Sequence, residues 1–339
     1  MHISFFETDT FPEDTEIDPK AYIKALDSFR KGDAVTIFTP DDTHCEIALA
    51  AVERGLHVLV TKPVVKTLSE HHKLFAAAKK NNVLVMVEVH KRFDPIYADA
   101  KDKLVSMGDF SYFDSYMSQP KHQLETFRAW AGKASDISYY LNSHHIDFHE
   151  WCFGGKALPR RVTATAATGV AEAMSIKTED VITVTAQWEN LPSGNLGTAS
   201  YTAAWSAPKA EVHSQQRFFM LTHGGDCQVD QAHRGFTHTT HEGGYQSCNP
   251  LFMKYTPSVG NEFAGQQGYG YRSIEAFIDA VEKINAGAAV SDFDASLPTI
   301  NTTFLTTAIL EAGRVSLDNQ GKPVDIVYDG DVPTSLKLA

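Results

Sequence analysis

Residues 34–63, AVTIFTPDDTHCEIALAAVERGLHVLVTKP, decide the fold of this chain. They contain two apolar runs, 34–38 and 57–60, whose β-branched residues are typical of strands buried on both faces. Between the runs, Thr43 and Glu46 have the spacing of a capping box, and Gly55 can end the helix that follows. The stretch therefore predicts a strand, a helix and a second strand, with Lys62 at the tip of the second strand.

The same alternation continues along the chain. Thr67 and Glu70 repeat the capping-box spacing before a helix that reaches residue 82, and residues 83–89 form a third apolar run. Asp94-Pro95 opens a further helix to about residue 107, and a short strand at 3–6 and a helix from Asp18-Pro19 precede the quoted stretch. Alternating strands and helices predict a parallel sheet with right-handed crossovers.

After Gly108 the pattern changes. Most of the later runs are β-rich and often alternate between apolar and polar residues, which predicts a mostly antiparallel open sheet with one covered face. These strands are expected at 110–118, 161–167, 181–188, 196–205, 217–223 and 324–328, and helices at 137–153, 273–285 and 299–317. Residues 231–271 are interpreted as a long loop. We expect an α/β domain at 1–107 and an α+β domain at 108–339.

Composition and charge exclude several classes of protein. The chain has 339 residues and a formal net charge of -12, with no basic stripe, so a nucleic-acid binder is not expected. The four cysteines are far apart and indicate reduced thiols rather than a disulfide framework. No apolar run is long enough to span a bilayer, and the acidic start does not resemble a secretory signal. A cytoplasmic protein is therefore expected.

Polar residues follow three neighbouring strands of the predicted parallel sheet. Because ligands of such sheets bind beyond the carboxyl ends of the strands, we expect these residues to converge on one site. Lys62 is the main candidate for chemistry, since a partly desolvated lysine has a lowered pKa and can act as a general acid or base. The alternative is an ordinary solvated lysine. The other strand-end residues are Thr39, Pro40, His44, Thr61, Pro63, Glu88, His90, Lys91 and Arg92.

The predicted helix 137–153 carries the second group of candidates. Tyr140 and His144 recur at helical spacing on its apolar face, and Asp147 is close enough in sequence to orient an imidazole. A histidine that merely packs in the core is the alternative. Asn142 lies on another face with His145 and His149, which have the i, i+4 spacing of metal ligands but no complete ligand set, so no metal is predicted. A second histidine pair, His238 and His241, and the solvated pair His71-His72 support no metal site either.

Taken together, the stretch from Asp33 to Pro63, the segment EVHKRFDP (88–95) and the segment NSHHIDFHEWCFG (142–154) resemble the Gfo/Idh/MocA family of NAD(P)-dependent sugar and polyol oxidoreductases. The resemblance implies that Lys62 and His144 are the catalytic lysine and histidine, and that hydride passes between nicotinamide and a carbinol or carbonyl carbon. It places Thr39, Pro40, His44, Thr61, Lys62, Glu88 and Arg92 on the NAD or NADP side, and Lys62, His144, Asn142 and Asp147 on the substrate side.

Three features depart from the family pattern. The family triplet Glu-Lys-Pro is Thr-Lys-Pro here, and Tyr140 stands where the family often has an aspartate, so Tyr140 becomes a third catalytic candidate. The first glycine is Gly32, so the glycine turn that receives the pyrophosphate is expected to be absent from this chain. The segment Gly265–Gly270 has the wrong spacing to replace that turn and is interpreted as loop.

Three functions remain open from the sequence. The first is an NAD(P)-dependent dehydrogenase or reductase acting on a sugar, polyol or related small molecule. The second is a non-catalytic ligand-binding or regulatory protein on the same scaffold, and the third is a family member that uses bound NAD to cleave glycosides. A homo-oligomer, dimer or tetramer, is expected because an open antiparallel sheet often associates face to face.

Overall fold

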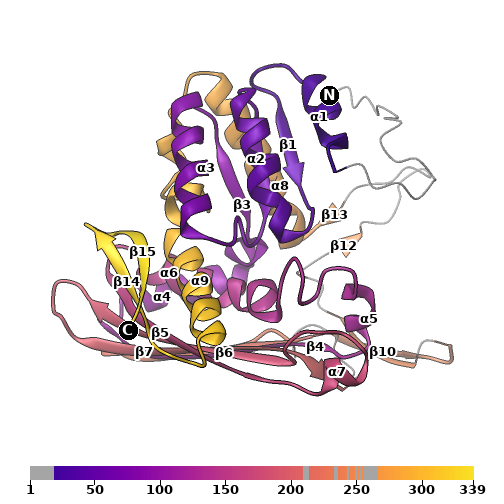
Figure 1. The fold of residues 1–339 in the computed structure, drawn as a ribbon, viewed down its shortest axis with the longest axis vertical. Coiled ribbons are helices and arrows are strands. Elements are labelled where there is room, and N and C mark those ends of the chain that lie inside the picture. Colours follow the sequence, from indigo (N-terminus) through magenta and orange to yellow (C-terminus); the bar gives the residue numbers. More distant parts are fainter. Residues whose placement is uncertain are drawn as a thin grey trace.

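The computed structural model describes residues 19–208, 214–232, 236–242, 244–248, 251, 254–255 and 266–339. A small parallel sheet with helices on both faces stands above a larger sheet, and helices fill the space between them (Figure 1). The strand expected at 3–6 and the helix cap expected at Asp18 lie outside the described residues. The first described helix is α1 (Ala21–Asp27).

The small sheet is the predicted parallel sheet. Its three strands are ordered β1-β2-β3, and both pairs run parallel, with Val60 opposite Val87. One face is covered by the two helices that connect the strands. The bounds are β1 (Ala34–Ile37), α2 (His44–Glu53), β2 (His57–Thr61), α3 (Leu68–Asn81) and β3 (Val85–Glu88).

The two expected capping boxes have different outcomes. Thr67 accepts a hydrogen bond from the Glu70 amide and the Glu70 carboxylate accepts one from the Thr67 amide, so the box that starts α3 is confirmed. The box expected at Thr43 is wrong. A 3₁₀ turn, Asp41–Thr43, precedes α2, and the Thr43 hydroxyl donates to the Pro40 carbonyl at 2.7 Å, so it makes no cap.

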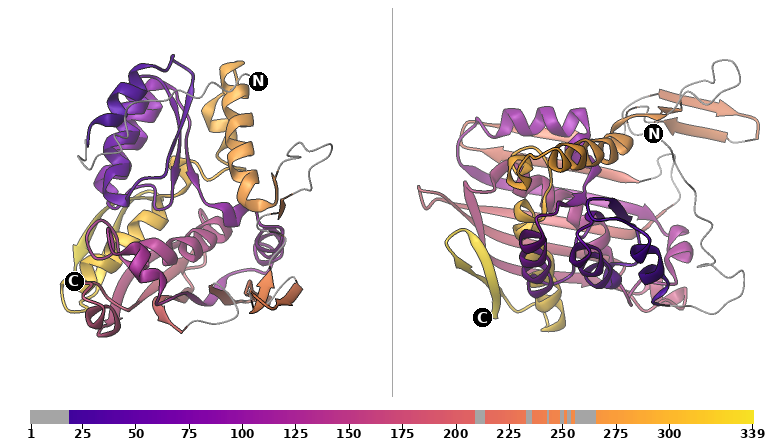
Figure 2. Two further views of the ribbon diagram at one scale, coloured as in Figure 1. Left: turned by 90° about the vertical axis from the view of Figure 1, so that its right-hand side faces the viewer. Right: turned by 90° about the horizontal axis from the view of Figure 1, so that it is seen from above.

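The opposite face of the small sheet is covered from a distant part of the chain. Phe277 and Val281 of α8 (Tyr269–Asn285) pack against Leu59 and Met86 of the sheet. The views of Figure 2 show this helix lying beside the strands. The domain division at residue 108 stays a prediction. The small sheet is covered on this face by α8, which follows residue 108 in the sequence.

The larger sheet has eight strands in the order β15-β14-β5-β6-β7-β4-β8-β9. All neighbouring pairs are antiparallel except β4 and β7, which run parallel, so the predicted mostly antiparallel sheet is confirmed. Its strands are β4 (Phe110–Pro120), β5 (Ala157–Ala167), β6 (Val181–Asn190), β7 (Leu196–Ala207), β8 (Gln215–Thr222), β9 (Gly225–Asp230), β14 (Val324–Asp329) and β15 (Val332–Leu338).

One face of this sheet carries the helices, and the other is left open in the described part of the molecule (Figures 1 and 2). The covered face holds the main core, in which Trp188, Tyr201 and Phe113 are fully buried. Gly197 permits the close packing, because a Cβ there would lie 2.3 Å from the ring of Phe110. The helices of this half are α4 (Pro95–Leu104), α5 (Gln123–Phe127), α6 (Ser143–Phe153), α7 (Val170–Ala173) and α9 (Phe304–Asp318).

Two sequence interpretations need correction. Within the expected loop 231–271, the described residues form two short antiparallel pairs, β10 (Phe236–Thr240) with β11 (Gly244–Cys248) and β12 (Lys254–Tyr255) with β13 (Gln266–Gln267). His71, expected on a solvated face, is buried because α9 packs there, and its ring nitrogens lie 2.8 Å from Thr307 Oγ1 and 2.7 Å from the Ile300 carbonyl.

Candidate active site

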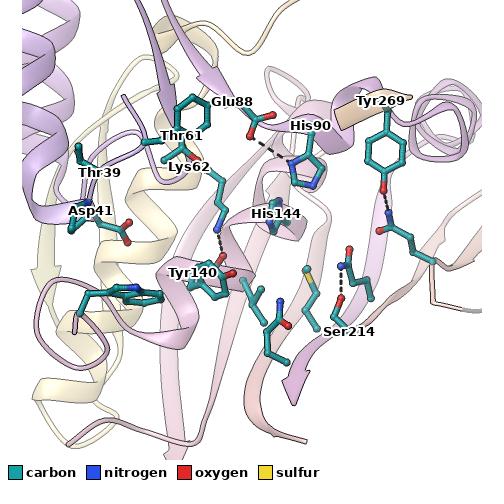
Figure 3. A pocket seen from close by; sticks show the side chains of 18 of the residues that line it. Thr39, Asp41, Thr61, Lys62, Glu88, His90, Tyr140, His144, Ser214 and Tyr269 are labelled. Carbon is teal, nitrogen blue, oxygen red and sulfur yellow. Dashed lines mark hydrogen bonds and ion pairs between the residues drawn. The ribbon is translucent and has the colours of Figure 1, made fainter. Parts of the chain in front are cut away.

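A cavity of about 770 Å³ lies between the carboxyl ends of β1–β3 and the large sheet (Figure 3). Each of the three strand ends contributes polar residues to it, as the sequence predicts, although not every predicted strand-end residue lines it. The rest of its wall comes from both halves of the chain. The lining residues are Phe38, Thr39, Pro40, Asp41, Thr61, Lys62, Glu88, His90, Met117, Gln119, Trp130, Tyr140, Leu141, His144, Ser214, Gln216, Gln231, Ala232 and Tyr269.

Lys62 extends from the end of β2 toward the helix below it. Its ammonium donates a hydrogen bond to the Tyr140 carbonyl and lies 4.1 Å from the centre of the Tyr140 ring. Burial lowers the pKa of Lys62 to about 8, against the opposing pull of the carboxylates of Asp41 and Glu88. A lysine with this pKa exchanges its proton near neutral pH, as a general acid or base must.

His144 lies on α6 and faces the same cavity (Figure 3). The residue is 5% exposed, and burial, reinforced by the neighbouring Lys62 and His90 side chains, lowers the pKa of its imidazole well below the ordinary value. Its Nδ1 is buried and has no hydrogen-bond partner among the described residues. Because buried polar atoms are nearly always paired, this nitrogen marks a place where a ligand group can bind.

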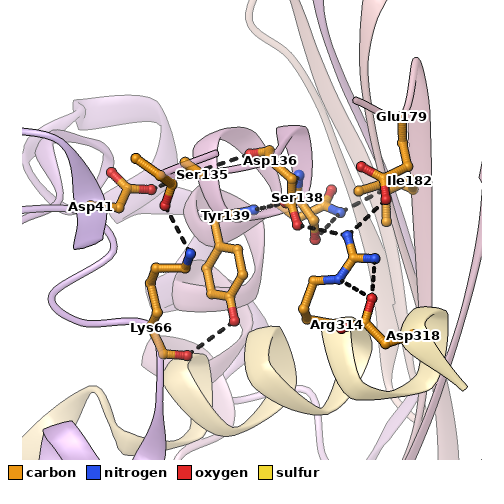
Figure 4. Close-up of polar contacts among 12 residues, drawn as sticks. Asp41, Lys66, Ser135, Asp136, Ser138, Tyr139, Glu179, Ile182, Arg314 and Asp318 are labelled. Atoms are coloured by element: carbon orange, nitrogen blue, oxygen red, sulfur yellow. Dashed lines mark hydrogen bonds and ion pairs between the residues drawn. The ribbon is translucent and has the colours of Figure 1, made fainter. Parts of the chain in front are cut away.

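Tyr140 lies on a π-helical turn, Ser138–Asn142, that leads into α6. Such turns are frequent at functional sites because they shift the side chains that follow out of α-helical phase. Asp136 holds the turn by accepting hydrogen bonds from the amides of Ser138 (2.8 Å) and Tyr139 (3.0 Å). Arg314 of α9 lies 3.3 Å from the same carboxylate, as Figure 4 shows. The turn that presents Tyr140 to Lys62 is therefore fixed from two sides.

Glu88 joins the cavity from the end of β3. Its carboxylate accepts a hydrogen bond of 2.8 Å from Ser273 of α8 and lies 3.6 Å from Nδ1 of His90. Burial acts to raise the pKa of Glu88, but His90, Ser273 and Lys62 outweigh it and lower the pKa below the ordinary value. Glu88 therefore supplies a negative charge near Lys62.

Four of the predicted site residues lie outside the cavity lining and have structural partners. His44 is buried, with ring nitrogens 2.8 Å from the carbonyls of Pro63 and Thr39, and so holds the two strand-end loops together. Arg92 and Asp147 form a buried, two-point ion pair. Asn142 donates to Ser138 Oγ at 3.0 Å. Asp147, expected to orient His144, is thus bound to Arg92 instead.

Sequence reasoning missed other residues that line the cavity. Asp41 directly follows the predicted Thr39-Pro40 pair, and its place in the sequence could have indicated it. Gln119 and Trp130 come from β4 and the segment after α5, where no local pattern points to a ligand site. Tyr269 lies in the glycine-rich segment 265–270 that was interpreted as loop. His90, which the sequence names among the strand-end residues, also lines the cavity, and the remaining missed residues are Phe38, Met117, Leu141, Ser214, Gln216, Gln231 and Ala232.

The histidine pair of α6 is engaged in the core. Nε2 of His145 lies 3.0 Å from the Tyr97 hydroxyl, and Nδ1 of His149 lies 2.6 Å from the Tyr201 hydroxyl. No group of three or more potential metal ligands occurs in the described part of the chain. Likewise, no helix of the described part is long and apolar enough to cross a bilayer. His238 is outside the residues whose side chains are described.

Comparison with known proteins finds similarity to one family of oxidoreductases. A model described as "Oxidoreductase family, NAD-binding Rossmann fold" (GFO_IDH_MocA) matches residues 4–89. This part of the chain is therefore similar to the NAD-binding domain of the Gfo/Idh/MocA family. Among curated relatives, the scyllo-inositol 2-dehydrogenase (NADP(+)) IolW of Bacillus subtilis is 29% identical over 59% of this chain and 54% of its own length. The scyllo-inositol 2-dehydrogenase (NAD(+)) of the same species is 39% identical over 21% of each chain.

The chain spans about half or less of the length of these curated relatives. Solved structures of similar fold match more of the chain. An inositol dehydrogenase homolog from Azotobacter vinelandii, complexed with NADH and myo-inositol, superposes with a TM-score of 0.65 at 19% identity. The superposition covers 91% of this chain and 82% of the Azotobacter vinelandii chain. The likeness shows that the two proteins share a fold that includes the large sheet.

Proposed function

We propose that the protein is an NAD(P)-dependent oxidoreductase that interconverts a carbinol and a carbonyl carbon of a small polyhydroxylated molecule. The observation that carries the proposal is the meeting of Lys62 and His144 in one cavity. Lys62 has a pKa of about 8, and His144 has a buried nitrogen without a partner among the described residues. This combination fits a site that binds a hydroxyl group and transfers its proton.

The cavity fits the nicotinamide end of a dinucleotide. Thr39, Pro40 and Thr61 lie at the carboxyl ends of parallel strands, where such cofactors bind, and would hold this end. When bound, the nicotinamide supplies a hydride acceptor or donor. The orphaned Nδ1 of His144 supports the fit, because it requires a polar group that the described protein does not provide.

Proton transfer is assigned to Lys62. In its neutral form Lys62 takes the proton from a substrate hydroxyl, and in its charged form it returns one to the carbonyl oxygen. Glu88 and Asp41 favour the charged form of Lys62, while burial favours the neutral form. His144 is kept neutral, so it orients the hydroxyl by a hydrogen bond without adding a positive charge beside Lys62. Tyr140 contributes its carbonyl and ring to placing Lys62.

The proposed substrate class is a sugar or polyol. Three glutamines line the cavity, and Gln119 is 7% exposed with an Oε1 that has no hydrogen-bond partner among the described residues. A neutral amide suits a neutral hydroxyl group, which can donate a hydrogen bond to this Oε1. The inositol dehydrogenases among the relatives support this class.

We also propose that the protein forms a homo-oligomer through the open face of the large sheet. Tyr112 and Leu221 pair across β4 and β8 on that face and are 39% and 40% exposed, and Leu196 of β7 is 61% exposed. A cluster of exposed apolar side chains on a helix-free sheet face supports burial against a second copy of the chain.

The proposed function is tested by binding and turnover. The protein is titrated with NADH and NADPH by fluorescence, then assayed with inositols, sugars and other polyols in the presence of both oxidised cofactors. We expect saturable binding of at least one cofactor and turnover of at least one polyol. Lys62→Ala is expected to lower turnover by about 100-fold or more with cofactor affinity retained. Lys103→Ala, at an exposed lysine paired with Asp99, is the matched control.

Absence of binding by either dinucleotide would refute the proposal. Binding with no turnover on any substrate would favour a non-catalytic ligand-binding protein. Turnover that survives Lys62→Ala unchanged would remove Lys62 from the chemistry while leaving the reaction class in place.

A further inference from the structure

Lys91 is a buried lysine directly behind the cavity wall. It lies in the 3₁₀ turn His90–Phe93 after β3 and is 1% exposed, although it does not line the cavity. Its ammonium donates to the side-chain oxygens of Gln216 and Gln231. It also lies 3.3 Å from the Tyr97 hydroxyl and 4.5 Å from the centre of the Tyr97 ring. A lysine is buried to this degree only when its charge is well compensated.

The contacts of Lys91 fix the orientation of both glutamine amides. An ammonium group has three donors and no acceptor, so each glutamine must turn its oxygen toward Lys91 and its amide nitrogen away. Gln216 Nε2 then donates to Ser214 Oγ at 2.7 Å. Gln231 Nε2 donates to the Tyr269 hydroxyl and to the carboxylate of Asp94, the latter at 3.2 Å.

The oriented glutamine amides donate hydrogen bonds to two hydroxyl groups that line the cavity. Ser214 and Tyr269 each accept a hydrogen bond from a glutamine, and the Ser214 hydroxyl keeps its own proton for donation. In Figure 3 both lie on the side of the cavity away from Asp41. No acceptor for the Ser214 hydroxyl occurs in the described chain. A wall arranged in this way donates hydrogen bonds, and it therefore suits an oxygen acceptor on the ligand.

We infer that Lys91 is a positioning residue that gives this wall its donor direction, and that a substrate oxygen is bound there as an acceptor. The inference rests on the proposed function for the identity of the ligand. The orientation of the amides does not depend on the proposed function, because Lys91 and both glutamines belong to the free protein. The two parts can therefore be tested separately.

The orientation is tested by NMR on protein labelled with ¹⁵N-glutamine. The side-chain signals of Gln216 and Gln231 are assigned from their loss in Gln216→Glu and Gln231→Glu. In the wild type we expect both amides to exchange with water more slowly than that of exposed Gln228. In Lys91→Met, which keeps the length of the stem, both signals are expected to move toward those of exposed glutamines. Lys103→Met, at an exposed lysine, is expected to leave them unchanged.

Fast exchange of both amides in the wild type would overturn the inference even if Lys91→Met fails to fold. Unchanged glutamine signals in a folded Lys91→Met protein would overturn it as well. These outcomes need no enzymatic activity.

The role in binding is tested by kinetics on the polyol that the wild type oxidises. Lys91→Met is expected to raise the substrate KM by about tenfold, the effect of one lost hydrogen bond, with kcat and cofactor affinity nearly unchanged. Gln216→Glu keeps an acceptor for Lys91 but loses the amide donor to Ser214, so it is expected to raise KM similarly. A fall in kcat as large as the expected rise in KM, with KM itself unchanged, would contradict the binding role. An inactive wild type would count against the proposed function, and the NMR result would still decide the role of Lys91.

Discussion

Two opposing effects act on the ammonium of Lys62. Burial under the large sheet disfavours its charge, whereas Asp41 and Glu88 favour it, and the net result is a pKa of about 8. The sequence places Lys62 at a strand end but does not show how deeply the end of that strand is covered. The π-helical turn that carries Tyr140 supplies the cover, and its carbonyl fixes the position of the amine.

This pKa leads to a prediction about the pH dependence of oxidation. Because Lys62 acts as a base only after losing its proton, kcat/KM for polyol oxidation is expected to rise with pH and to level off above about pH 8. The measurement is a set of initial rates at limiting substrate from about pH 6 to about pH 10. The reverse reduction, which needs the charged lysine, is expected to fall over the same range.

Lys62→Arg provides the control, since a guanidinium does not lose its proton in this range. Its residual activity is expected to be low and independent of pH. A profile that still bends near pH 8 in this variant would assign the titration to another group.

The helix α6 is held against its neighbours by buried charges. Arg92 bonds Asp147 through Nε at 2.9 Å and Nη2 at 2.8 Å, and the two side chains are 6% and 2% exposed. At the other end, Glu150 accepts hydrogen bonds from the amides of Leu305 and Thr306 and so caps α9. These contacts set the position of His144, although none of them touches the cavity.

Breaking the ion pair is expected to cost stability rather than chemistry. Asp147→Asn leaves the Arg92 charge buried without its partner, and we expect a loss of about 3–5 kcal/mol in the free energy of unfolding. Urea unfolding at neutral pH measures it. Asp99→Asn, which breaks the exposed pair with Lys103, is the control and is expected to change the free energy of unfolding by less than about 1 kcal/mol.

The same variant tests the sequence-based assignment of Arg92 to the cofactor. If Arg92 acts only through Asp147, NAD(H) affinity of the folded Asp147→Asn protein stays near the wild-type value. A large change in affinity without loss of stability would instead favour a direct cofactor role.

At the scale of the whole molecule, the cavity exists only because two sheets face one another. Residues after β1, β2 and β3 form one side, and β4, α6 and β8 form the other. The helix α8 then returns to the small sheet and brings Ser273 to Glu88 and Tyr269 to the cavity. The other face of the large sheet remains free for a second chain in the described part of the molecule.

Association through that face predicts a measurable change in mass. Sedimentation equilibrium of the wild type is expected to give at least two chains per particle, and Tyr112→Glu with Leu221→Glu is expected to give monomers, because charge on a buried apolar face opposes association. Phe29→Glu, at an equally exposed apolar residue on the other side of the molecule, is the control. A monomeric wild type, or a double variant that remains associated, would refute this interface.

The sequence by itself determined the parallel β-α-β alternation, the mostly antiparallel second sheet, and the strand-end residues Thr39, Thr61, Lys62 and Glu88. It could do so because period, caps and turn residues act locally, and because carboxyl ends of parallel strands share one edge. It also placed His144, since helical spacing shows which residues lie on a common face.

Only the tertiary structure decided what each of these residues touches. His44 and Asp147 carry polar side chains in suggestive positions, yet packing brings them to a carbonyl and to Arg92 rather than to the cavity. Gln216 and Gln231 carry no local signal, and they reach the site because β8 lies beside β4 and β9 lies beside β8. Contacts between distant segments depend on how whole elements pack, which the spacing within any one segment does not encode. Lys62 gains its lowered pKa from that packing.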